Sequence, residues 1–169
     1  MDKRALSKTS IQKYLKRLKL GYLGSCLDTV LNEAKSARLT PIETLAYALS
    51  MEVDSRENKR LALGMSLAHF PRVCTLENFD FNCPTSIDPA QIRDLARLEW
   101  IGENKNLLFL GPPGVGKTHL AIALGRKAVE AGYSVTFITA SSLLKQLKKA
   151  SQAGRLDEKL LQYIKPRLL

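Results

Sequence analysis

The residues with the clearest chemical meaning run from Gly111 to Thr118 and spell Gly-Pro-Pro-Gly-Val-Gly-Lys-Thr. They match the phosphate-binding loop G-x-x-x-x-G-K-[ST], the Walker A motif of P-loop proteins. Glycines allow the backbone to approach phosphates closely and to turn its N–H groups toward them. Lys117 suits the β- and γ-phosphates, and the Thr118 hydroxyl suits a magnesium ion. The motif therefore predicts a site for a nucleoside triphosphate with Mg²⁺.

The residues expected to contact the nucleotide are consecutive in the chain. They are Gly111, Pro112, Pro113, Gly114, Val115, Gly116, Lys117, Thr118 and His119. Thr118 is the residue expected to bind the metal, and the residues by themselves indicate no catalytic group.

The motif needs a strand before it and a helix after it. Residues 106–110 form a short apolar run that predicts a buried parallel strand. Residues 117–131 have helical spacing, and Gly132 is suited to close that helix. Residues 134–139 predict a second strand. This order of elements predicts an α/β fold of the P-loop type in which the sheet is incomplete.

The first part of the chain predicts a different architecture. Residues 1–70 hold apolar residues at helical spacing near the N-terminus and again after Thr40, and they predict a small all-helical domain for DNA or partner binding, which leaves 71–169 for the P-loop domain. Thr40 and Glu43 form a capping box around Pro41 and start a helix. The apolar residues expected to face the core from this helix are Ile42, Leu45, Leu49 and Val53.

Three further helices are predicted in the second domain. Asp88 precedes Pro89 and is suited to cap a helix that runs to about Ile101. Ser141 or Ser142 is suited to cap a helix that ends near Ala153. A last helix is predicted over 155–164, before Pro166.

Charge is distributed unevenly over the 169 residues, whose net charge is +10. Residues 1–71 hold 12 basic and 7 acidic side chains, 72–140 hold 7 of each, and 141–169 hold 7 and 2. Basic flanks around a neutral centre indicate a polyanionic partner, most simply DNA. The candidate DNA contacts are Lys13, Lys16, Arg17, Lys145, Lys148 and Lys149. Alternatives for the basic N-terminal helix are a solvated face and, more weakly, a membrane-surface helix.

Composition also limits the location. No apolar run approaches the ~20 residues that span a bilayer, and no signal peptide is evident at the N-terminus. Cys26, Cys74 and Cys83 are odd in number and lack a C-x-x-C pair, which favours free thiols in a reducing cytoplasm.

Several segments together resemble one family. They are the helical N-terminal domain, Thr75-Leu76-Glu77-Asn78-Phe79-Asp80-Phe81, the run 106–125 with its Thr-His-Leu-Ala extension, and 132–137. The chain resembles the IstB-like ATP-binding proteins, helpers of insertion-sequence transposases that are related to the DnaC helicase loaders. The resemblance implies an AAA+ ATPase that forms homo-oligomers on DNA, binds ATP between subunits and presents target DNA to a transposase.

The resemblance also implies roles for particular residues. Lys117 and Thr118 would hold the phosphates and magnesium, the loop around Asn78 and Phe79 would lie near the base, and the helix with Lys145 would face DNA. It implies a packing or polar role for His119 and no catalytic role.

The resemblance further implies what this chain lacks. In the family, the segment that matches 165–169 continues into an apolar strand that ends in Asp-Glu, before the sensor residues, arginine finger and lid. The family's third and fourth strands lie between the first two, which here would lack ladder partners. We therefore expect ATP binding with little or no hydrolysis. Alternatives are a DnaC-like helicase loader and a non-enzymatic remnant that binds only DNA or partner subunits; a small-molecule kinase is the weakest.

Overall fold

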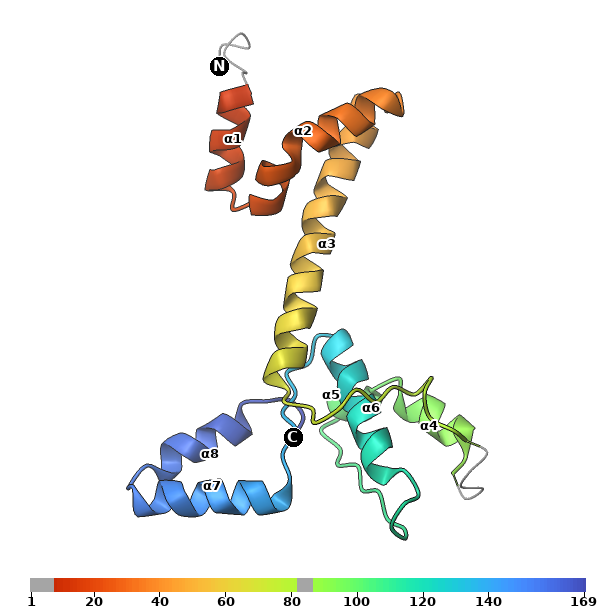
Figure 1. Ribbon diagram of the computed structural model, residues 1–169, viewed down its shortest axis with the longest axis vertical. Helices are drawn as coiled ribbons and strands as arrows, with labels where there is room; N and C mark the ends of the chain where they lie inside the picture. The colour runs from red at the N-terminus through yellow and green to blue at the C-terminus, as the bar shows by residue number, and fades with distance from the viewer. Residues whose placement is uncertain (1–7, 82–86) are drawn as a thin grey trace. The chain divides into compact units, whose positions relative to one another are not determined.

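The computed structural model describes residues 8–81 and 87–169 (Figure 1). Their helices are α1 (Lys8–Arg17), α2 (Gly21–Ser36), α3 (Pro41–Leu67), α4 (Pro89–Leu95), α5 (Glu99–Gly102), α6 (Lys117–Glu130), α7 (Ala140–Gln152) and α8 (Leu156–Ile164). Contacts divide the chain into two compact units, Met1–Arg60 and Leu61–Leu169. The predicted domain boundary after residue 70 stays a prediction.

Unit 1 consists of α1, α2 and most of α3, which share one small core. The buried apolar residues of this core are Leu15, Leu23, Leu27, Val30 and Ala48. Glu52 of α3 is buried beside them, and its carboxylate accepts hydrogen bonds from the Leu23 N–H at 2.9 Å and from Arg56 Nε at 2.9 Å. Leu20, the N-cap of α2, provides no side-chain acceptor. Glu52 therefore supplies both an acceptor and a negative charge to the N-terminus of α2.

The capping box at the start of α3 is confirmed. The Thr40 N–H donates to Glu43 Oε2 at 2.7 Å, and the Glu43 N–H donates to Thr40 Oγ1 at 3.4 Å. The hydrogen bonds from Thr40 lower the pKa of Glu43, because they stabilise its ionised form. Pro41 is the first residue of the helix, as its fixed φ favours.

The predicted inward face of α3 is wrong. Ile42, Leu45, Leu49 and Val53 are exposed, from 43% for Leu49 to 72% for Ile42. The α3 side that packs on α1 and α2 instead carries Tyr47, Ala48, Met51 and Glu52. Both sets have helical spacing, so the sequence pattern alone does not select between them. The set that finds neighbours is the buried one.

The core of unit 2 forms around α6. Six of its buried residues are Leu120, Ile122, Ala123, Leu124, Ala128 and Val129. Gly64 and Gly125 allow neighbouring segments to pack closely in this core. A Cβ at Gly64 would lie 2.7 Å from Val129, and a Cβ at Gly125 would lie 3.0 Å from Phe70. Gly132, with φ of 93°, follows the end of α6 as predicted.

The predicted α/β sheet is wrong for this chain. Within residues 8–81 and 87–169 no strand forms, and the only β-bridge is a parallel one between Val135 and Leu168. The predicted strand 106–110 pairs with none of the described residues, and Leu110 is 88% exposed. A parallel strand exists only where a neighbour completes its ladder. The apolar run marks a segment suited to pairing, and the described chain offers it no partner.

The other predicted helices differ from the observed ones in detail. Asp88 caps α4 as predicted, with its Oδ1 accepting from the Ala90 N–H at 2.8 Å. The helix expected to reach Ile101 is broken into α4 and α5, because Leu98 adopts a left-handed conformation with φ of 64°. Thr139, not Ser141 or Ser142, caps α7 by accepting from the Ser142 N–H at 3.3 Å.

The thiols of Cys26 and Cys74 are free, and Cys83 lies outside the described residues.

Across the ranges that the structure describes, no helix is both long enough and apolar enough to cross a bilayer.

Candidate functional site

The loop before α6 is built on glycines in conformations that other residues rarely adopt. Gly111, Gly114 and Gly116 have φ of 153°, 85° and 87°. At Gly116 the space is also filled, because a Cβ there would lie 2.9 Å from Cζ of Phe79 and closer still to Cε2. These positions therefore require glycine for backbone conformation, and Gly116 requires it for close packing as well.

The loop ends where α6 begins. Gly116 is the N-cap of this helix and has no side chain to bond the N–H groups of the first turn. The first turn of an α-helix has N–H groups without intrahelical acceptors, and the helix dipole places partial positive charge there. This end of α6 is therefore suited to an anion.

Lys117 and Thr118 are the first residues of α6. Lys117 folds back over the loop, and its Nζ donates to Gly111 O at 2.8 Å and to Pro112 O at 2.6 Å. Thr118 is exposed on the adjoining position of the first turn. One cation and one hydroxyl thus stand at the helix end that attracts anions.

A second segment, residues 75–81, packs against the end of the loop and the first turn of α6. The Phe79 ring contacts Gly116 and lies edge-to-face with His119, with ring centroids 5.3 Å apart. His119 Nε2 is 2.8 Å from Thr75 O. The imidazole of His119 thus contacts segment 75–81, and the expectation that His119 contacts the nucleotide stays a prediction. The expectation that Asn78 and Phe79 lie near a bound base stays a prediction.

The contact between Phe79 and Gly116 was not predicted from the sequence. The only signal for it is the occurrence of an aromatic segment upstream of a P-loop, which gives no register. The contact forms only because the chain, after α4 and α5, brings Gly116 back beside Phe79.

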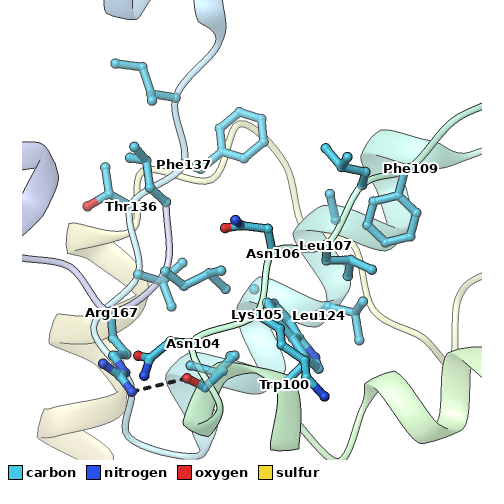
Figure 2. A pocket seen from close by; sticks show the side chains of 18 of the residues that line it. Trp100, Asn104, Lys105, Asn106, Leu107, Phe109, Leu124, Thr136, Phe137 and Arg167 are labelled. Atoms are coloured by element: carbon cyan, nitrogen blue, oxygen red, sulfur yellow. Dashed lines mark hydrogen bonds between the residues drawn. The ribbon is translucent and has the colours of Figure 1, made fainter.

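A cavity in unit 2 lies apart from the phosphate loop. Its volume is about 690 Å³, and Figure 2 shows Asn106, Leu107 and Phe109 on one side of it and Thr136 and Phe137 on the other. It lies beside segment 106–110, which pairs with none of the residues that the structure describes, and no residue from 111 to 119 lines it. This cavity is therefore separate from the loop.

The candidate DNA contacts lie on two helices in different units. Lys13, Lys16 and Arg17 are exposed on α1, and Lys145, Lys148 and Lys149 are exposed on α7. Lys149 also lines a groove of about 420 Å³ between α7 and α8, together with Arg155 and Lys159. Neither set belongs to the loop 111–119.

A glycine loop in left-handed conformations that leads into Lys-Thr at the start of a long helix defines the P-loop class of nucleotide-binding proteins. The family model described as IstB-like ATP binding protein matches residues 13–169. The chain belongs to this family, which confirms the resemblance inferred from its motifs.

The curated relatives are proteins of insertion sequences. The chain is 36% identical over 162 residues to a protein of insertion sequence IS5376 of Geobacillus stearothermophilus, and 40% identical over 159 residues to one of IS21 of Pseudomonas aeruginosa. Both are named for ATP binding. The matches cover 96% and 94% of this chain, and 64% and 60% of those relatives. The chain thus spans somewhat less than two thirds of their length.

Proposed function

We propose that this chain binds ATP with Mg²⁺ at residues 111–119 and serves the transposition of an insertion sequence. The observation that carries the proposal is the loop itself. Three glycines with positive φ lead into the free end of α6, and the Lys117 ammonium lies across the loop. The names of the relatives support ATP as the nucleotide and transposition as the process.

Each part of the loop has a task in this proposal. The N–H groups of the first turn of α6 would face the phosphates, and Lys117 Nζ would exchange its two carbonyl partners for β- and γ-phosphate oxygens. The Thr118 hydroxyl would ligate Mg²⁺, which neutralises phosphate charge when bound. His119 would hold segment 75–81 through Thr75.

Binding of a fluorescent ATP analogue tests the proposal. Lys117→Ala is expected to weaken binding about tenfold or more, because a hydrogen bond to a charged group contributes roughly 1.5–3 kcal/mol. Lys105→Ala is the control, since Lys105 is exposed and its ion-pair partner is Glu103, which belongs neither to the loop nor to segment 75–81. Equal affinity in the two variants would refute the site.

Magnesium is tested through Thr118. In Thr118→Val the side chain keeps its shape and loses its hydroxyl, so ATP binding should no longer improve when Mg²⁺ is added. A Thr118→Ser variant, which retains the hydroxyl, should keep the magnesium effect. An unchanged magnesium effect in Thr118→Val would remove Thr118 from the metal site.

We further propose that the partners are DNA and a transposase, in the cytoplasm where the DNA lies. Each phosphate contact adds about 0.9 to the salt slope of DNA affinity. Replacing Lys145, Lys148 and Lys149 by Gln should therefore lower the slope by about 2 to 3, and replacing Lys13, Lys16 and Arg17 should do the same. The matched control replaces Arg93, Arg97 and Lys105, from the electroneutral segment. If the control variant lowers the salt slope equally, the effect comes from total charge, and the two helices are not specific DNA contacts.

A further inference from the structure

A further cavity of unit 2 lies beside the first half of α7 and the second half of α8, the two helices at the lower left of Figure 1. Its volume is about 450 Å³, and residues from 67–71, 136–139 and the two helices line it. No residue of the loop 111–119 does so, and the cavity is therefore separate from the proposed nucleotide site. It shares Gln146, Lys159 and Gln162 with the groove between α7 and α8, so the two hollows meet at these side chains.

Hydrogen bonds fix the walls of this cavity. The Phe137 N–H donates to Ala68 O at 2.8 Å, which ties the segment before α7 to the end of α3. The Tyr163 hydroxyl donates to Gln146 Oε1 at 2.8 Å, which ties α8 to α7. The cavity is therefore a pre-formed feature of unit 2, as sites for small ligands usually are.

The polar groups of the lining are mostly hydrogen-bond donors. Gln146 Oε1 accepts from Tyr163, and Gln162 Oε1 accepts from Lys159 Nζ at 2.9 Å, so each carboxamide has its NH₂ group left to donate. The Lys159 ammonium lies 5.3 Å from the centroid of the Tyr163 ring and keeps further hydrogens for a ligand. The Ser142 hydroxyl adds another donor. A lining of this kind suits a ligand that is rich in acceptors.

The charge of the lining is positive. Lys159 is half-buried, and among the described residues no carboxylate forms an ion pair with it. No Asp or Glu of the described residues lines the cavity. Glu158 lines the adjoining groove, where Lys149, Arg155 and Lys159 outnumber it, and Asp157 lines neither hollow. The cavity therefore favours a ligand with negative charge.

We propose that this cavity binds a phosphate group, with Lys159 as the cationic contact and the NH₂ groups of Gln146 and Gln162 as further donors. A phosphate combines negative charge with several acceptor oxygens, which matches both properties of the lining. The group belongs either to a free phosphate compound or to the backbone of DNA. The inference does not depend on the nucleotide site. Where DNA supplies the phosphate, the inference rests on the DNA contacts proposed for α7, of which Lys149 lines the adjoining groove.

A proton–nitrogen NMR titration of the whole chain tests the proposal. One arm adds sodium phosphate at constant ionic strength, and the other adds a short oligothymidine without terminal phosphates. The side-chain NH₂ signals of Gln146 and Gln162 report the cavity, and the backbone signals of Gly114 and Gly116 report the loop. Because both sites are followed in one sample, failure of this inference is distinct from failure of the nucleotide site.

Three variants complete the test. Lys159→Gln should weaken binding at the cavity about tenfold or more, because it removes a hydrogen bond to a charged group. Gln162→Glu keeps the shape of the side chain, places a carboxylate beside Lys159 and should abolish binding there. Lys165→Gln is the matched control and should bind as the wild type does, since it removes the same charge directly after α8 and Lys165 lines neither hollow.

The arms also identify the source of the phosphate. Cavity signals that shift with sodium phosphate indicate a free phosphate compound, and signals that shift only with the oligothymidine indicate the DNA backbone. Three results would overturn the proposal. They are cavity signals that neither ligand shifts, equal shifts with sodium chloride at the same ionic strength, and equal affinity in Lys159→Gln and Lys165→Gln.

Discussion

Replacement of Gly116 by alanine tests how the phosphate loop is held in place. The change has two separable costs. An alanine at φ of 87° is in the left-handed region, which costs roughly 1–2 kcal/mol. Its Cβ would also lie 2.9 Å from Cζ of Phe79, and overpacking of this kind costs about 1–3 kcal/mol. The expected total loss in the free energy of unfolding is about 2–5 kcal/mol.

Two variants separate these costs. Gly114 has φ of 85°, and a Cβ added there would meet no atom within 4 Å, so Gly114→Ala should lose only the conformational part, about 1–2 kcal/mol. In a Phe79→Leu background, Gly116→Ala should cost about the same as Gly114→Ala, because the ring that it strikes is gone. The coupling between positions 79 and 116 should therefore be about 1–3 kcal/mol.

Urea unfolding followed by the fluorescence of Trp100, the single tryptophan of the chain, measures these free energies in unit 2. A cost for Gly116→Ala that equals that of Gly114→Ala, or that is the same with and without the Phe79 ring, would refute the reasoning. The packing of segment 75–81 on the loop would then have no energetic weight.

Two more predictions concern unit 1 and the unpaired segment. Hydrogen bonds lower the pKa of Glu52, with the larger effect from the Leu23 N–H and a smaller one from Arg56. The stability that the Glu52 carboxylate contributes is therefore present above the ordinary glutamate pKa and is lost as pH falls through the lowered pKa of Glu52. Far-UV circular dichroism should show an acid-induced loss of helix that is smaller in Glu52→Gln, which is less stable at neutral pH; identical pH profiles would contradict this role. Leu110→Lys should reduce self-association through the unpaired segment 106–110, since charge on an exposed extended edge opposes pairing. Light scattering measures this, and Glu103→Lys, on exposed chain outside the segment, is its control.

The features that sequence predicted well depend on residues close together in the chain. The bonds between Thr40 and Glu43, the cap at Asp88 and the left-handed Gly132 each involve neighbours, so their residue types are sufficient. The start of α6 directly after the glycine loop was also predicted, because it too depends on residues that are neighbours in the chain.

The features that it predicted wrongly depend on distant partners. The run 106–110 has the composition of a buried strand, but a strand also needs a neighbour, and the described residues offer none. The inward face of α3 was misassigned because both of its sides carry apolar residues at helical spacing, and only packing on α1 and α2 selects the side with Ala48. The break at Leu98 has no signal in the residue type, since leucine rarely adopts a left-handed conformation.

The packing of segment 75–81 on the start of α6 has a thermodynamic consequence. Because Phe79 rests on Gly116 and Thr75 O bonds His119, the segment and the loop order one another. A ligand that fixes the loop should slow amide hydrogen exchange in 75–81. Linkage between two binding events is reciprocal. A partner that holds segment 75–81 in place should therefore raise the affinity of the loop for its ligand by the same factor by which that ligand raises the affinity for the partner.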